Sequence, residues 1–93
     1  MKILAVCGSG LGSSFMLEMN IKDILQEMGF MEIEVDHSDL SSASPDQADL
    51  FVVAKDIAEG AAHLQDIVVL ESIIDMDELK TKLVKTLQEK GVL

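Results

Sequence analysis

The feature that most constrains the fold is an apolar run near the N-terminus, followed at once by a glycine-rich segment. The run spans Ile3 to Val6, and the segment after it reads Cys7-Gly8-Ser9-Gly10-Leu11-Gly12-Ser13-Ser14. A wholly apolar run is typical of a central strand that is covered on both faces. Glycines let successive backbone N–H groups point into one hollow, and serines favour a helix start. The pattern predicts a strand, an anion-binding loop and a helix, with the only cysteine at the head of the loop.

The rest of the chain predicts three more strands and a second long helix. The first helix should start near Ser13 or Ser14 and run to Met28, where Gly29 ends it. Residues 31–36 alternate apolar and acidic side chains, which indicates an edge strand with one solvent-exposed face. A polar loop follows to residue 49. Apolar strands are expected at 50–54 and 67–70, with a short helix or turn between them at 55–64. The last helix ends near Gly91, and its buried stripe is Met76, Leu79, Leu83, Val84 and Leu87.

Strands that are separated by crossover segments favour parallel pairing with right-handed connections. With the alternating segment at an edge, the strand order becomes 2-1-3-4. We therefore expect one domain over residues 1–93, a Rossmann-like α/β fold in which a four-stranded parallel sheet forms the middle of a three-layer α/β/α sandwich. Ligands of such sheets bind at the carboxyl ends of the strands, where the winding direction changes. Cys7 and Lys55 should both lie at that edge.

The amino-acid composition limits which ligands the chain can bind and in which compartment it works. The net charge of −10 argues against a nucleic-acid partner, because phosphate backbones are bound by Lys and Arg. All seven basic residues are lysines, so a phosphate site here must use backbone N–H groups, hydroxyls or a lysine in place of guanidinium. One cysteine cannot form an internal disulfide, which favours a reducing cytoplasm, and no apolar run reaches the roughly 20 residues of a membrane span. Two distant histidines and one cysteine have no metal-ligand spacing, so we expect neither a metal nor a cofactor.

Cys7 is the candidate nucleophile. A helix N-terminus and its N–H groups favour a thiolate by on the order of 1 kcal/mol, although many single cysteines are only small buried hydrophobes. A Walker A loop needs a lysine after its last glycine, and Ser13 stands there. A cysteine phosphatase of the low-molecular-weight tyrosine phosphatase type needs an arginine at that same position. A phosphatase-like hydrolase, with Asp39 or Asp56 as its acid, and a non-catalytic anion-binding module remain alternatives to a phosphoryl carrier.

The stretch from Ala5 to Ser14 resembles the enzyme IIB components of the bacterial phosphoenolpyruvate-dependent sugar phosphotransferase system, most closely their ascorbate and galactitol group. The resemblance implies that a phosphohistidine of enzyme IIA phosphorylates Cys7. The phosphocysteine then passes the group to a sugar, ascorbate or a related one, which the membrane-embedded enzyme IIC holds. It also implies a phosphate loop whose N–H groups and hydroxyls come from Gly8, Ser9, Gly10, Leu11, Gly12, Ser13 and Ser14. We expect such a protein to be cytoplasmic and monomeric.

A few other residues call for an interpretation. Lys55 is the one lysine expected near the loop, either as an auxiliary group that neutralises phosphate or as an ordinary solvated side chain. We expect His37 in an exposed turn after the edge strand and His63 in the short third crossover. Leu11, Phe15 and Met16 fit a docking patch beside the loop, with ordinary core packing as the alternative.

Overall fold

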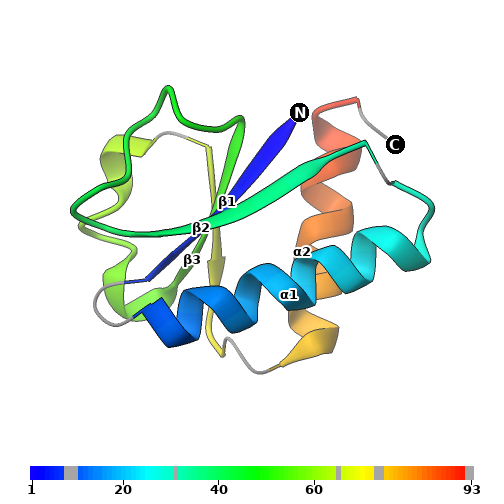
Figure 1. Ribbon diagram of the computed structural model, residues 1–93, viewed down its shortest axis with the longest axis horizontal. Helices are drawn as coiled ribbons and strands as arrows, with labels where there is room; N and C mark the ends of the chain where they lie inside the picture. The colour runs from blue at the N-terminus through cyan, green and yellow to red at the C-terminus, as the bar shows by residue number, and fades with distance from the viewer. Residues whose placement is uncertain (8–10, 31, 65, 73–74, 92–93) are drawn as a thin grey trace.

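The computed structural model describes residues 1–7, 11–30, 32–64, 66–72 and 75–91, and the side chains of residues 11–14 are not part of that description. The strands are β1 (Lys2–Cys7), β2 (Glu34–Asp39), β3 (Leu50–Ala54) and β4 (Ile67–Leu70) (Figure 1). The α-helices are α1 (Leu11–Glu27) and α2 (Met76–Glu89), and two 3-10 helices, η1 (Lys55–Ile57) and η2 (Ala62–Leu64), join β3 to β4.

The four strands form one parallel sheet in the order β2-β1-β3-β4. This arrangement confirms the predicted fold class and strand order. β1 is central and apolar, and its side chains from Ile3 onward are buried, whereas β2 is an edge strand in which only Val35 is buried. Because all four strands are parallel, their carboxyl ends meet at one edge of the sheet, and the winding direction changes between β1 and β3.

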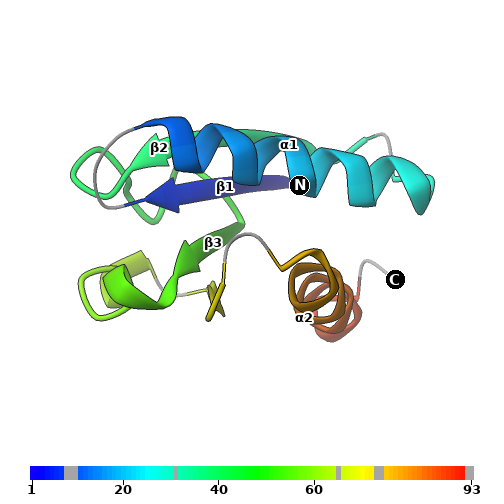
Figure 2. The same ribbon diagram turned by 90° about the horizontal axis from the view of Figure 1, so that it is seen from below.

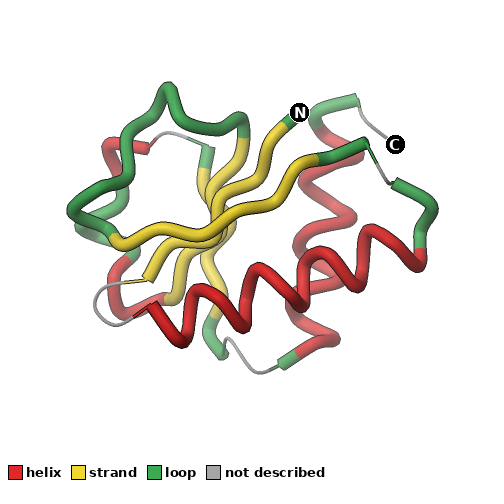
Figure 3. Tube along the Cα trace, viewed as in Figure 1, coloured by secondary structure: helices red, strands yellow, loops and turns green. Residues whose placement is uncertain are grey.

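The two faces of the sheet are covered differently. Alternate residues of each strand point to opposite faces. Ile3 and Ala5 pack under α1 and α2 in one core cluster, whereas Leu4 and Val6 belong to a second cluster with Phe51. The second face is covered by the β2–β3 connection and by η1 and η2, which lie on the side of the molecule away from α2 (Figure 3). The third layer of the sandwich is therefore built from turns and 3-10 helices.

Two predicted boundaries were wrong. The helix α1 begins at Leu11, before the predicted Ser13 or Ser14, and ends at Glu27, after which Gly29 adopts the left-handed φ of 84°. The edge strand spans Glu34–Asp39 where residues 31–36 were predicted. Its position is set by β1, which pairs along its whole length from Lys2↔Glu34 to Cys7↔Asp39. Hydrogen bonding to β1 thus extends the strand into polar residues that were predicted to form a loop.

The helix α2 largely follows its predicted stripe. Leu79, Leu83 and Leu87 are fully buried, Val84 is partly buried, and Met76 is exposed because it is the first residue of the helix. Burial of a leucine side chain contributes roughly 1.5–3 kcal/mol, so this stripe fixes α2 on the sheet. Among the residues that the structure describes, no helix is both long and apolar enough to span a membrane.

Candidate functional site

Cys7 is the last residue of β1, at the carboxyl edge of the sheet, and only 9% of its surface is exposed. The helix α1 starts four positions later and lies over β1 and β2, with its N-terminus at the end where β1 finishes (Figure 2). Of the predicted phosphate loop, Gly8, Ser9 and Gly10 lie outside the described residues, and Leu11, Gly12, Ser13 and Ser14 form the first turn of α1. That turn contains no acidic residue, so no carboxylate of the turn itself competes with a bound anion for its N–H groups.

The edge strand β2 brings Asp39 beside Cys7. The two residues are register partners, and the backbone N–H of Leu40 donates to the carbonyl oxygen of Cys7 at 2.9 Å. The Asp39 carboxylate accepts from the Ser42 N–H at 3.0 Å and from the Ser41 hydroxyl at 3.1 Å. These bonds, that of Ser42 foremost, hold the pKa of Asp39 below its ordinary value. A carboxylate that stays ionised is a poor proton donor, which weakens the case for Asp39 as the acid of a hydrolase.

Lys55 lies where the sequence places it, at the start of η1 directly after β3 and therefore at the same edge as Cys7. Its ammonium nitrogen is 3.8 Å from Glu71 Oε1, just beyond the end of β4, and both side chains are more than two-thirds exposed. An exposed ion pair of this kind contributes little to stability, so Lys55 can exchange Glu71 for another anion at small cost.

A polar cluster that the sequence analysis missed lies between α1 and β2. Glu18 is 6% exposed, and its carboxylate is bonded to Lys22 Nζ at 2.6 Å and to Nδ1 of His37. Burial alone would raise the pKa of Glu18, but hydrogen bonds from Lys22 and His37 outweigh it and lower that pKa. His37 thus lies within β2 and faces α1, where an exposed turn had been predicted. The sequence did contain a signal for this cluster. Glu18 lies three residues before Ile21 and seven before Leu25, so helical spacing puts it on the same face as these apolar residues.

The same cluster holds the one group of potential metal ligands found among the described residues. One ligand atom from each of Glu18, Asp36 and His37 lies within 4.8 Å of the others. Lys22 already neutralises Glu18, so the ion pair accounts for the cluster without a metal.

The N-terminal half of α1 also exposes apolar side chains. Phe15, Met16 and Met19 are 51%, 40% and 49% exposed. The Phe15 ring meets the His37 ring edge to face, with centroids 5.6 Å apart. Phe15 and Met16 therefore lie at the surface near the predicted loop, which fits the docking interpretation better than core packing.

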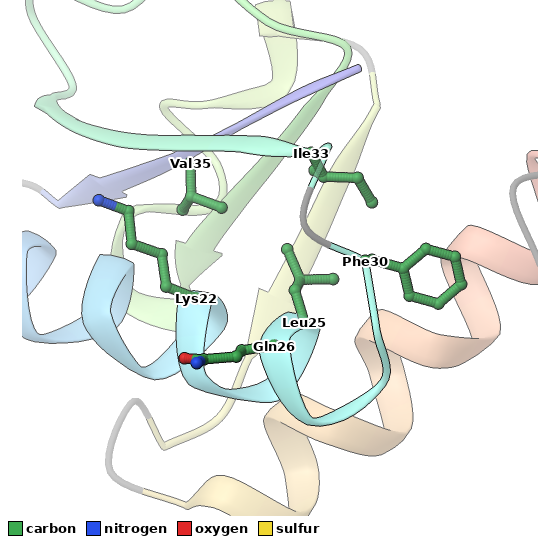
Figure 4. Close-up of a pocket in the computed structure, with 6 residues that line it drawn as sticks. All are labelled: Lys22, Leu25, Gln26, Phe30, Ile33 and Val35. Atoms are coloured by element: carbon green, nitrogen blue, oxygen red, sulfur yellow. The ribbon is translucent and has the colours of Figure 1, made fainter.

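A shallow cavity of about 270 Å³ opens at the other half of α1, between this helix and β2 (Figure 4). Its lining consists of Lys22, Leu25, Gln26, Phe30, Ile33 and Val35. None of these residues belongs to the predicted phosphate loop, so the cavity is separate from the edge of the sheet that carries Cys7.

Comparison with known proteins shows which family the chain matches. The family described as "PTS system, Lactose/Cellobiose specific IIB subunit" matches residues 2–89. No curated protein sequence matches the chain. The lactose-specific IIB component domain from Streptococcus pneumoniae superposes with a TM-score of 0.56 and 21% identity, covering 96% of this chain and 92% of that one. The lactose/cellobiose type is thus supported, and the ascorbate and galactitol group is not.

Two phosphatases share the fold. A low-molecular-weight protein tyrosine phosphatase from Bacillus subtilis superposes with a TM-score of 0.61 and 18% identity, covering 96% of this chain and 98% of that one. A mutant of the arginine phosphatase YwlE with a phosphorylated active-site serine gives a TM-score of 0.56 and 12% identity, covering 95% and 90%. At these identities the likeness shows the common fold alone.

Proposed function

The chain belongs to the lactose/cellobiose-specific IIB subunit family of the phosphotransferase system, and from this premise we propose that Cys7 is the residue that carries the phosphoryl group. The family acts in phosphoryl transfer for sugar uptake, together with IIA and IIC partners. The proposal adds the atom that is phosphorylated, the groups that hold the phosphate, and the direction of transfer.

The reaction consists of two displacements at phosphorus. The Cys7 thiolate attacks the phosphohistidine of enzyme IIA, the S–P bond forms, the P–N bond breaks, and the released imidazole takes up a proton. A sugar hydroxyl held by enzyme IIC then attacks the thiophosphate, the O–P bond forms, and Cys7 leaves as a thiolate while the hydroxyl proton passes to a base or to water. Both steps need positioning and stabilisation of charge more than covalent help.

One observation carries the proposal: the only cysteine of the chain is the last residue of the central strand, at the edge of the sheet where α1 begins. A helix N-terminus favours both a thiolate and a phosphate. We propose that the phosphate is held by the N–H groups of residues 8–14 and the hydroxyls of Ser13 and Ser14, with Lys55 as an auxiliary cation. The chain has no arginine, so its grip is looser than that of a phosphatase, which suits a group that must be passed on.

The proposal extends to the setting of the reaction. We place it in the cytoplasm, in a single domain of residues 1–93 that acts as a monomer and docks its two partners in turn. The exposed Phe15 and Met16 form an apolar rim on which either partner can dock despite the net charge of −10. The name of the matched family makes lactose or cellobiose the first sugars to test as acceptors.

The test follows the intact mass of the protein during incubation with phosphorylated enzyme IIA. We expect one phosphoryl group on the wild type and none on Cys7→Ala. Alanine is the clean control, since the arginine phosphatase mutant carries its phosphoryl group on a serine. Addition of IIC vesicles with lactose or cellobiose should discharge the adduct, and ascorbate serves as the comparison sugar. A wild-type protein that gains no adduct would contradict the proposal.

The hydrolase alternative predicts a different result. A phosphatase turns over an aryl phosphate in the absence of any sugar or partner protein. We expect no such turnover above the level of Cys7→Ala, because the guanidinium clamp is absent and Asp39 stays ionised. An anion-binding module would give neither adduct nor turnover, and its phosphate affinity would survive Cys7→Ala.

A further inference from the structure

Glu18 is the one buried charged side chain among the residues for which the structure gives burial. Burial of a carboxylate is costly unless its charge is paired and its oxygens are hydrogen-bonded. Both conditions are met, because Oε2 is 2.6 Å from Lys22 Nζ and Oε1 is bonded to Nδ1 of His37. Lys22 lies on the same helix, so of these two bonds only the one to His37 reaches the sheet. This bond adds a polar link between the helix and strand β2 to their apolar packing.

His37 lies next to the strand that carries Cys7. Its register partner is Ala5, and Cys7 is two residues further along β1, so alternation places both side chains on the α1 face. Strand spacing and rise put their Cα atoms about 8 Å apart. The Phe15 ring meets the imidazole edge to face at 5.6 Å, one helical turn before Glu18. The imidazole is thus held between Phe15 and Glu18, under the N-terminal half of α1.

We infer that Glu18 and His37 are positioning residues for phosphoryl transfer at Cys7, and that the charge state of His37 tunes that transfer. The inference rests on the proposed function of Cys7. The pair fixes the angle at which α1 crosses the β1–β2 edge, and so fixes where its N-terminal N–H groups point. A protonated His37 makes a charge-assisted bond to Glu18, whereas a neutral imidazole donates a weaker one.

Several charges act on His37. From α1 it faces Glu18, and Lys22 lies behind that carboxylate. From its own strand, Asp36 Oδ1 lies 3.7 Å from its Nδ1, and Asp39 follows two residues later. From β1 the ionisable neighbour is Cys7, whose phosphorylation would add negative charge and favour the imidazolium. The surroundings thus couple the protonation of His37 to the phosphorylation of Cys7.

The test compares rates of phosphoryl transfer from phosphorylated enzyme IIA to Cys7, from about pH 5.5 to about pH 8.5, the range in which histidine side chains of proteins change charge. The variants are Glu18→Gln, His37→Gln and the double variant, all assayed with a chelator present so that no metal contributes. His63→Gln is the matched control, because His63 is exposed on η2 and, among the described residues, its ring bonds to the nearby Gly60 carbonyl oxygen. Rates are taken as ratios of wild type to variant, which cancels the effects of pH that are common to both proteins, such as those on the donor.

We expect a ratio of about five at low pH that falls to about two at high pH for both single variants, since a charged hydrogen bond is worth about twice a neutral one. The double variant should be no slower than either single one, and His63→Gln should give a flat ratio near one. Ratios that are flat with pH, or identical for His37→Gln and His63→Gln, overturn the inference. A wild type that gains no phosphoryl group points instead to failure of the proposed function.

A second readout separates positioning from general destabilisation. The His37 ring is followed by NMR at neutral pH with and without phosphorylation of Cys7, and the imidazole resonances of the wild type should shift on phosphorylation. The shift should shrink in Glu18→Gln, whose neutral amide no longer anchors the imidazolium beside α1. Should the imidazole resonances of His37 be the same in both forms of the wild type, the coupling is refuted whatever the variants do to stability.

Discussion

The helices α1 and α2 lie against the same face of the sheet, yet their N-terminal turns differ in charge. The first turn of α2 has Asp77 and Glu78, and Asp75 caps it by accepting the Glu78 N–H at 3.1 Å. The first turn of α1 has no acidic residue, although the chain as a whole carries 17. Because a carboxylate near a helix N-terminus is stabilising, its absence from α1 gives up stability.

The sides of the two helices differ as well. On α2 the fully buried residues are three leucines, and Lys82 joins Glu78 to the carbonyl oxygen of Val69 with two bonds of 2.7 Å. On α1 the buried set includes Glu18, and large apolar side chains such as Phe15 and Met19 are exposed. The contacts of α2 thus serve stability, whereas the features of α1 fit the proposal that its N-terminus binds the phosphoryl group and its side binds a partner.

The largest expected effect comes from truncation of the core under each helix. Leu83→Ala on α2 and Leu17→Ala on α1 remove side chains that are 0% and 1% exposed, so each should lower the free energy of unfolding by about 2–5 kcal/mol. Urea denaturation measures that loss. Phosphoryl transfer per folded molecule should be unchanged in Leu83→Ala and reduced in Leu17→Ala, because the phosphate site is proposed to lie at the N-terminus of α1. Equal transfer in both variants would remove the distinction between the helices.

The next effect comes from giving α1 the kind of charge that α2 has. Ser13→Asp adds a carboxylate to the first turn of α1, where it should raise the melting temperature slightly through the helix dipole. If the phosphoryl group binds at this turn as proposed, the added charge repels it, by about 3 kcal/mol for two unit charges about 6 Å apart at an effective dielectric constant of about 20, so transfer to Cys7 should fall about 100-fold. Ser13→Asn, which keeps the size without the charge, is the control. Normal transfer in Ser13→Asp would mean that the phosphate lies elsewhere.

A change of pH probes the charges of α2. Glu78 accepts from the N–H groups of Glu71 and Ser72 and from Lys82, and these bonds, that of Lys82 foremost, lower its pKa to about 2. Because the pKa is lower in the folded protein than the ordinary 4.5, the stabilisation is complete above about pH 5 and is lost as the pH falls through 2. Melting temperatures from pH 7 to pH 2 should fall more steeply for the wild type than for Glu78→Gln. If the melting temperatures of the two proteins fell in parallel, the bonds from Glu78 to the segment after β4 would not stabilise the fold.

Much of the fold, including both helices, could be predicted from the sequence, because these elements depend on local patterns. The apolar run Ile3 to Val6, the glycine-rich segment and the helical spacing of the last stripe each predict an element without reference to the rest of the chain. Their order along the chain then favours the strand order that the structure has. The beginning of α1 at Leu11 was missed, because serines at 13 and 14 looked like caps although they lie inside the first turn.

What could not be predicted depends on contacts between distant segments. The alternation at residues 31–36 was consistent with a strand there, but pairing with β1 moved the strand to Glu34–Asp39. That shift brought His37 into the sheet and against Glu18, 19 residues away. A local pattern does not show which face of a neighbouring helix such a residue meets, so the cluster beside Cys7 became visible only in the folded chain.

The smallest effect concerns the cap of α2. Asp75→Ala removes the carboxylate that accepts the Glu78 N–H, and loss of such a cap typically costs about 1 kcal/mol. The melting temperature should fall by several degrees, as expected for a domain of this size. Transfer to Cys7 should not change, because the cap lies at the N-terminus of α2 and the phosphoryl group is proposed to bind at that of α1. Asp75→Asn should restore most of the stability, since asparagine caps a helix about as well as aspartate. A loss of transfer in Asp75→Ala with stability intact would instead show that the two N-termini act on the same phosphoryl group.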